Sequence, residues 1–341
     1  MAAERARRSI ARRIYPNFIT TGVSMCPHME VRMLFLPAER FILTIIATLL
    51  LLGGILIVVK GVEIDFTGYA GLASIGISSL ALGQYYRLFR PDIRISATLT
   101  AAGLFLIFSM AGSIFNYMLL PIRFVPIDAY LSRIDAAFGF DWPSFVMWIA
   151  TYPLFGDLLR LVYFSSLPQL VLVILVLGFF VDIATLHRFL LTGILGALLS
   201  ILCWSFFPSF GASSVYQLPQ TVLQAMPIAV GPTYGAELVR LGQEGVSYLT
   251  PRNVLGLIGF PSFHTVMACM SVCFVTRIRF VFWPLAVVNL VMVPAILVQG
   301  GHHLSDVFGG VAIFCIAYVL AGNVLRQKNT VAVEVASLAV K

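Results

Sequence analysis

The stretch FILTIIATLLLLGGILIVV occupies residues 41–59 and contains no charged residue. A helix that crosses the hydrocarbon core of a bilayer needs about 20 mainly apolar residues, so this run is long enough to span. The composition of the whole chain agrees with it: 60% of the 341 residues are hydrophobic and 11% are charged. In soluble domains about 45–50% of the residues are apolar and about 25% are charged. The sequence therefore predicts an integral membrane protein.

Further apolar runs follow, and we predict an all-α integral membrane protein with about eight transmembrane helices. The predicted spans are residues 41–59, 67–85, 95–120, 158–181, 189–207, 261–276, 280–299 and 302–325. The apolar stretches between the third and fourth spans are short and broken by proline. We expect interfacial helices there, with Trp142, Trp148 and Tyr152 at the depth of the headgroups.

The distribution of Lys and Arg gives the orientation, because cationic loops resist translocation. Most of the 22 Lys and Arg fall on one side if both termini are cytoplasmic. Residues 121–157 and 208–259 then lie outside. The Arg-rich first forty residues show no cleavable signal peptide. We expect a bacterial inner membrane protein whose site faces the periplasm.

Two polar motifs stand at the outer ends of the sixth and eighth predicted spans. Residues 261–264 read PSFH and residues 302–306 read HHLSD. His302 and Asp306 are four residues apart, so a helix places them on one face. The carboxylate can then accept the proton of one imidazole nitrogen and leave the other as a nucleophile or base.

The two motifs together resemble those of the type 2 phosphatidic acid phosphatase (PAP2) superfamily. Its members carry Pro-Ser-x-His at the start of one core helix and His-x-x-x-Asp at the start of the helix two spans later. The resemblance covers residues 95–325 and implies a six-helix catalytic core of the lipid phosphatase or phosphotransferase type. A basic cytoplasmic segment (1–40) and two additional transmembrane helices (41–94) would precede this core, and a cytoplasmic tail (326–341) would follow.

The resemblance implies catalytic roles for three residues. His302 would attack the phosphorus to form a phosphohistidine, and Asp306 would orient His302. His264 would protonate the leaving oxygen and then activate an acceptor alcohol or water. This scheme needs no metal and no cofactor. The same side chains could instead bind zinc, although no zinc-ligand string such as HExxH is present.

The chain also departs from the common phosphatases of this superfamily. They carry Ser-Arg before the second motif, where this chain has Ala295 and Ile296. They also carry a Lys-x6-Arg-Pro phosphate clamp before the first motif, and this chain has no such string. In both departures the chain resembles the inositol phosphotransferase and inositol phosphorylceramide synthase branch of the superfamily.

Phosphoryl transfer still requires positive charge or hydrogen-bond donors around the phosphate. We expect Arg252, and less so Arg240, to bind substrate, although Arg252 could equally be a solvated loop residue. Backbone N–H groups at the helix starts near Ser262 and His302 are further candidates. His303 has two open interpretations, substrate binding and a position that faces the headgroups.

The predicted function is phosphoryl or phospho-headgroup transfer from a phospholipid or sphingolipid to an alcohol or to water. The alternative within this class is a plain lipid phosphatase acting on phosphatidate or a polyprenyl pyrophosphate. The alternative from another class is a proton-coupled transporter, for which paired broken helices in two related halves are expected and are not evident. Nucleic-acid binding is not expected, since no extended basic and aromatic surface is present. The oligomeric state stays open.

Overall fold

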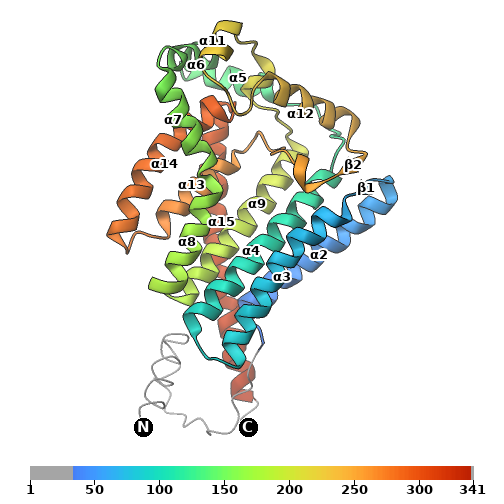
Figure 1. Cartoon of the computed structure of the whole chain (residues 1–341), viewed down its shortest axis with the longest axis vertical. Coiled ribbons are helices and arrows are strands. Elements are labelled where there is room, and N and C mark those ends of the chain that lie inside the picture. The colour runs from blue at the N-terminus through green and yellow to red at the C-terminus, as the bar shows by residue number, and fades with distance from the viewer. Residues whose placement is uncertain (1–33, 339–341) are drawn as a thin grey trace.

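The computed structural model describes residues 34–338 and shows an almost entirely helical chain (Figure 1). Long helices form a bundle, and a cap of shorter helices, residues 121–152 and 207–262, covers one end. Residues 1–33 of the predicted basic segment and the last three residues of the predicted tail lie outside the described residues. The all-α membrane fold that the sequence predicts is confirmed.

Six helices within residues 34–338 are long and apolar enough to cross a membrane. They are α2 (Pro37–Lys60), α3 (Phe66–Leu88), α4 (Ile93–Met118), α9 (Ile183–Phe206), α14 (Arg279–Gln299) and α15 (Leu304–Leu338), of which the stretch to Gln327 is the candidate span. Each contains most of one predicted span. The other two predicted spans differ from the expectation.

The fourth predicted span, residues 158–181, is divided into α7 (Pro153–Phe164) and α8 (Ser166–Phe180). At the break, the hydroxyls of Ser165 and Ser166 donate to backbone carbonyls in the preceding turn. Pro168 follows closely and has no N–H with which to continue the helical hydrogen bonds. The interruption therefore has a local cause in the sequence.

The sixth predicted span, residues 261–276, contains only the short helix α13 (Phe263–Cys273). At a rise of about 1.5 Å per residue this helix is roughly 16 Å long, against about 30 Å for the hydrocarbon core. It contacts α8, α9, α14 and α15, so other helices surround it. Non-helical backbone at membrane depth is tolerated where protein encloses it. α13 is therefore an interior helix of the bundle and not a full span.

The cap consists of short helices that lie across the end of the bundle (Figure 1). They are α5 (Asp128–Ala137), α6 (Trp142–Ala150), α10 (Ala212–Val215), α11 (Gln220–Ala225) and α12 (Pro232–Glu244). α6 meets α7 at an angle of 114°. Trp148 and Tyr152 are exposed, but Trp142 is buried and donates to the carbonyl of Leu297 at 2.8 Å. Trp142 therefore faces the protein interior and not the lipid headgroups.

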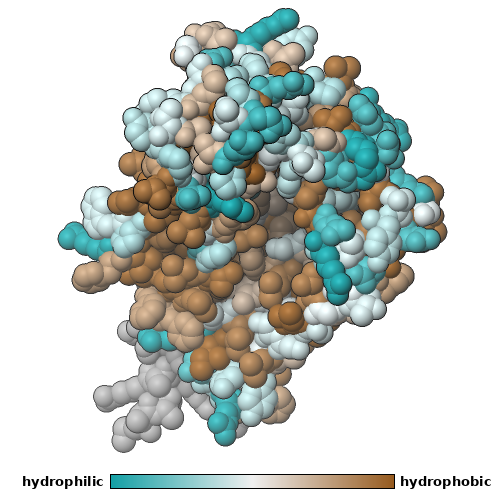
Figure 2. All heavy atoms as spheres, turned by 45° about the horizontal axis from the view of Figure 1, so that its top comes forward, coloured by the Kyte–Doolittle hydropathy of each residue, from teal (hydrophilic) through white to brown (hydrophobic). Residues whose placement is uncertain are grey.

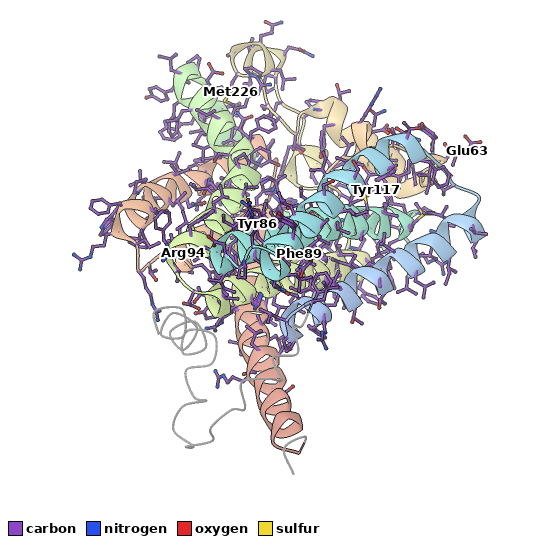
Figure 3. The ribbon with its side chains drawn as sticks, turned by 60° about the horizontal axis from the view of Figure 1, so that its bottom comes forward. Glu63, Tyr86, Phe89, Arg94, Tyr117 and Met226 are labelled. Carbon is purple, nitrogen blue, oxygen red and sulfur yellow. The ribbon has the colours of Figure 1, made fainter. Side chains whose placement is uncertain are left out.

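The helices α2 and α3 form a hairpin that packs on α4. Gly76 of α3 and Gly103 of α4 lie so close that a Cβ on Gly103 would be 2.8 Å from the Gly76 carbonyl oxygen. Small residues thus let the two backbones approach. Figure 3 places Glu63 at the capped end of the hairpin and Phe89 toward the other end.

The hairpin is tied to the rest of the chain at both ends. At the capped end, β1 (Glu63–Ile64) pairs in parallel with β2 (Tyr248–Leu249). At the other end, Glu39 of α2 is buried and accepts two hydrogen bonds from Arg87 of α3, at 2.6 and 2.7 Å. His187 of α9 lies 3.4 Å from the same carboxylate. Removing one partner of such a buried pair costs about 3–5 kcal/mol.

Hydrophilic side chains gather over the cap, and hydrophobic side chains cover the bundle below it, around a hollow in this face (Figure 2). Figure 3, turned the other way, shows Met226 of the cap beside α7. Gly156 at this contact leaves room for the Met226 side chain, which is fully buried. The cap is therefore packed onto α7.

The predicted orientation is testable by cysteine labelling in intact cells, in a background whose five native cysteines are replaced by serine. We expect a cysteine at Gln243 in α12 to react with a membrane-impermeant maleimide, and one at Arg277 not to react until the cells are lysed. Both positions are exposed, whereas the neighbouring Gly242 is buried against Phe210. The reverse labelling pattern would contradict the orientation and place both histidine motifs on the cytoplasmic side.

Candidate functional site

The structure places the two motifs side by side, although almost forty residues separate them. The amide of Ser262 donates to the backbone carbonyl of Asp306 at 3.0 Å. Gly310 of α15 permits this approach, since a Cβ there would be 2.5 Å from the carbonyl oxygen of Ser262. Ser262 is buried and caps α13, its hydroxyl accepting from the amide of Thr265 at 3.4 Å. The starts of α13 and α15 therefore adjoin.

His302 and Asp306 form a buried pair at the start of α15. The distance from His302 Nδ1 to Asp306 Oδ2 is 3.0 Å, and the same oxygen accepts from the amide of His303 at 2.9 Å. Asp306 is the third helical residue, and a carboxylate at this position commonly accepts the amide of the residue before the helix. This carboxylate favours the imidazole tautomer with the proton on Nδ1, which leaves Nε2 of His302 free.

His264 faces the same place from the first turn of α13. Its ring centroid lies 6.2 Å from that of His302, and it stacks on Tyr163 of α7 at 4.3 Å and 21°. Gly300 permits the arrangement, because a Cβ there would approach both Tyr163 and His302 to within 2.9 Å. The structure thus brings together the three predicted catalytic residues. Tyr163 escaped prediction, since it sits in an apolar run without a motif.

The loop before His302 is held to the cap by backbone hydrogen bonds. Gly301 has φ +61°, in the left-handed region that favours glycine, and its carbonyl accepts from Ser213 at 3.2 Å. Gln299 accepts from Val230 through its backbone carbonyl at 2.8 Å and from Ala229 through its side chain at 2.9 Å. The position of the loop is therefore coupled to the cap.

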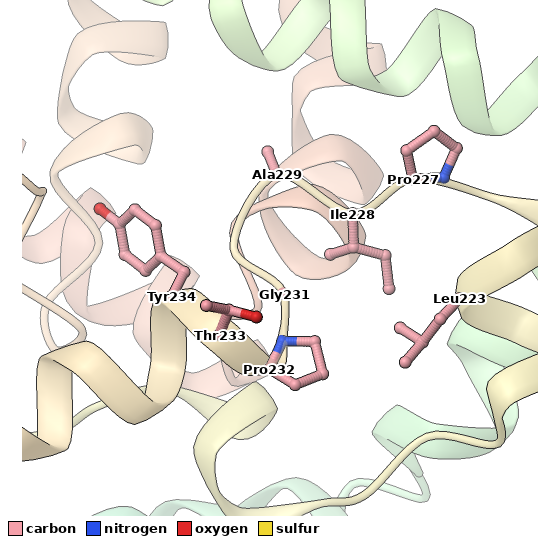
Figure 4. A pocket seen from close by; sticks show the side chains of 8 residues that line it. All are labelled: Leu223, Pro227, Ile228, Ala229, Gly231, Pro232, Thr233 and Tyr234. Carbon is pink, nitrogen blue, oxygen red and sulfur yellow. The ribbon is translucent and has the colours of Figure 1, made fainter.

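A cavity of about 380 Å³ lies in the cap beside this connection (Figure 4). Its lining residues are Leu223, Pro227, Ile228, Ala229, Gly231, Pro232, Thr233 and Tyr234. The hydroxyl of Tyr234 accepts from the amide of Gly256 at 2.7 Å, in the segment that leads to α13. None of the lining residues carries a charge, and none is a predicted site residue.

The amides of three residues at the start of α15, His303, Leu304 and Ser305, are already hydrogen-bonded within the protein, so they offer no free donor to a phosphate here. Asp306 accepts from the amide of His303, and Asp135 of α5 accepts from those of Leu304 and Ser305 at 2.8 and 2.9 Å. Carboxylates commonly satisfy the free N–H groups of a helix start and interact favourably with its dipole. At the start of α13, the hydroxyl of Ser262 caps the helix by accepting from the amide of Thr265.

Neither of the two predicted arginines makes a described hydrogen bond or ion pair with the histidines. Arg240 is exposed and pairs with Glu237 and Glu244 of its own helix, at 2.6 and 3.1 Å. Arg252 is exposed in the short 3₁₀ helix Pro251–Asn253. No hydrogen bond or ion pair joins a Lys or Arg to the three predicted catalytic residues within residues 34–338.

His303 is fully buried and lies between two carboxylates of α5. Its Nε2 is 3.4 Å from Asp128 Oδ1, and its Nδ1 is 3.6 Å from Asp135 Oδ2. Burial disfavours the charged imidazole, but the two carboxylates outweigh this effect and raise the pKa of His303 to about 9. The side chain has no exposed surface, so neither of the two interpretations from sequence describes it.

Replacement of His303 by Gln should change how stability depends on pH. An unfolded histidine has a pKa of about 6.5, so the raised pKa stabilises the folded state by up to about 3 kcal/mol. The advantage of wild type over His303→Gln should be full below about pH 6.5 and disappear as the pH rises through about 9. Unfolding midpoints in detergent across this range measure it, with His187→Gln as control. A difference that grows with pH would contradict the assignment.

Comparison with known proteins places this site in a family. The family model described as the PAP2 superfamily matches residues 129–320, more than half of the chain. The match begins in α5 and ends in α15, so α4, which the predicted core 95–325 includes, lies outside it. No curated protein and no solved structure matches the chain. The chain belongs to the PAP2 superfamily, and this membership supports a phosphatase or phosphotransferase activity in general.

Proposed function

We propose that the chain transfers a phosphoryl or phospho-headgroup between lipids through a phosphohistidine at His302. The observation that carries the proposal is the constellation of His302 paired with Asp306 at 3.0 Å and the His264 ring at 6.2 Å. A nucleophile, the group that orients it and an acid or base face one point, which is the arrangement that covalent catalysis requires.

The proposed reaction has two steps. Nε2 of His302 attacks the phosphorus, an N–P bond forms, the ester P–O bond breaks, and His264 gives its proton to the leaving oxygen. His264 then takes the proton of an alcohol or water, whose oxygen attacks the phosphorus and breaks the N–P bond. Asp306 holds the Nδ1 proton of His302 throughout and stabilises the positive charge on the ring. The face of Tyr163 interacts favourably with His264 when it is protonated.

The lack of a described Lys or Arg contact at the three catalytic residues favours a phosphodiester donor. A phosphodiester carries one negative charge and a phosphomonoester up to two, and the described contacts bring no Lys or Arg to the three catalytic residues. Ala295 and Ile296, in place of the Ser-Arg of the common phosphatases, are buried in α14. These features support transfer of the inositol phosphorylceramide synthase type. The proposed location, the extracytoplasmic face of a bacterial inner membrane, rests on the distribution of Lys and Arg along the sequence.

The experiment that tests this proposal is incubation of the purified protein with headgroup-labelled lipids. Phosphatidylinositol and phosphatidylcholine are the diester donors, phosphatidate is the monoester, and each is supplied with and without ceramide or diacylglycerol. We expect the label to move from a diester onto the acceptor. Release of phosphate from phosphatidate alone would instead identify a plain lipid phosphatase. No turnover of any lipid would overturn the proposal and favour the transporter alternative.

Activity should survive strong chelators, because the proposed chemistry uses only protein side chains. The described residues contain no group of three or more His, Cys, Asp and Glu arranged to hold a metal ion. The measurement is the initial rate after incubation with EDTA and 1,10-phenanthroline, compared with untreated enzyme. Loss of activity that zinc restores would contradict the scheme and revive the zinc alternative.

A further inference from the structure

His303 contributes the one basic side chain of a buried charge cluster with Asp128 and Asp135, which we name the His303 bridge. The two carboxylates stand seven residues apart on α5, so one face of that helix presents both of them. All three side chains are buried. Removing the histidine would leave two carboxylates buried without a counter-ion, which is strongly unfavourable.

Each carboxylate also fixes a second segment of backbone. Asp128 accepts from the Ser209 hydroxyl at 2.7 Å and from the amides of Phe210 and Gly211. Asp135 accepts from the first two amides of α15. The bridge therefore connects the cap helix α5, the segment after α9 and the start of α15.

The bridge is joined to the nucleophile through a shared oxygen. Oδ2 of Asp306 accepts from the amide of His303 and from Nδ1 of His302. A shift of the His303 backbone would therefore move this carboxylate and change the orientation of the His302 ring. We propose that His303 is a positioning residue that, through Asp128 and Asp135, holds His302 toward His264. This inference rests on the proposed function.

The charged groups that face His303 come from two elements. Asp128 and Asp135 belong to α5, and Asp306 belongs to α15, where it also faces His302. All of these neighbours are acidic, and each stabilises the protonated form of His303. Loss of that proton would weaken the bridge without altering the nucleophile itself.

The test compares wild type, His303→Gln and the control His187→Gln, all purified in lipid nanodiscs, with bis(4-nitrophenyl) phosphate as the diester probe. We expect His303→Gln to lower kcat by about 10–100-fold and to leave KM within about twofold, since a small misplacement of a reacting group can cost about 10²-fold. The kcat of wild type should also fall as the pH rises through about 9, and His303→Gln should lack this fall. His187, at the opposite end of the bundle, should matter little to kcat or KM.

Asp135→Asn provides a second variant in case His303→Gln does not fold. The two carboxylate oxygens accept separately from Leu304 and Ser305, so the single amide oxygen can keep one of these hydrogen bonds, and one negative charge beside His303 is lost. The alkaline fall of kcat should therefore move to lower pH. A folded His303→Gln with the kcat and pH profile of wild type would overturn this inference alone, as would an unmoved alkaline fall in Asp135→Asn. An inactive wild type would overturn the proposed function and the positioning role with it.

Discussion

Substitution of His302 by alanine should reduce turnover below detection and abolish the covalent intermediate. In a hydrolase with a covalent intermediate, removal of the nucleophile costs roughly 10⁶-fold in kcat. The measurement is rapid quench with a donor labelled at phosphorus, in alkali, because a phosphohistidine resists alkali and is lost in acid. Label should accumulate on wild type at residue 302 and be absent from His302→Ala.

Two comparisons make that result specific. His187→Ala removes another buried histidine, at the opposite end of the bundle, and should retain both activity and label. An unfolding midpoint for each variant distinguishes a missing nucleophile from a misfolded protein. Label mapped to residue 264 would invert the proposed roles of the two histidines. Full activity of His302→Ala would end the phosphohistidine hypothesis.

Asp306→Asn should lower kcat by about 10⁴-fold while KM changes little. The amide keeps the size of the carboxylate but loses its charge. One carboxylate oxygen takes both hydrogen bonds, so an amide that turns its NH₂ to this place presents a donor to Nδ1 of His302 and fixes the wrong tautomer, and one that turns its oxygen there no longer stabilises the positively charged ring. In a serine protease, replacing the aspartate behind the catalytic histidine by asparagine costs about that factor through the wrong tautomer. The expected result is a slow but measurable phosphohistidine in single-turnover experiments.

The control for this variant is Asp135→Asn, which changes a neighbouring carboxylate that caps the same helix but makes no contact with His302. It should cost far less in kcat than Asp306→Asn. An equal loss of kcat in the two variants would mean that the effect comes from a disturbed start of α15 and not from the contact of Asp306 with His302. A kcat within tenfold of wild type for Asp306→Asn would contradict the orienting role.

The parts of this structure that the sequence predicts are those with local causes. Uncharged apolar runs give the six long helices, and the spacing of His302 and Asp306 gives their pair, because four residues make about one helical turn. The meeting of PSFH with HHLSD follows from two helices that start on one side of the bundle. The pairing of Arg240 with Glu237 and Glu244 is also local, because residues three and four apart lie next to each other on a helix.

Other features depend on contacts that no local pattern records. The bridge joins His303 to Asp128 and Asp135, which lie about 170 residues earlier, and only the packing of α5 brings them together. The spacing of the two aspartates suggests a shared helix face, but not what they face. Likewise, apolar character alone does not distinguish α13, which other helices surround, from a span that faces lipid.

The burial of His302 has a consequence for which donor headgroups would react. Because only 5% of His302 is exposed, a phosphate that reaches it must give up water on the side that faces the ring. The cost of dehydrating the headgroup then becomes part of the barrier. Between two donors of equal charge, the one whose headgroup holds water less tightly should react faster, so the enclosure of the site can act as a filter on hydration.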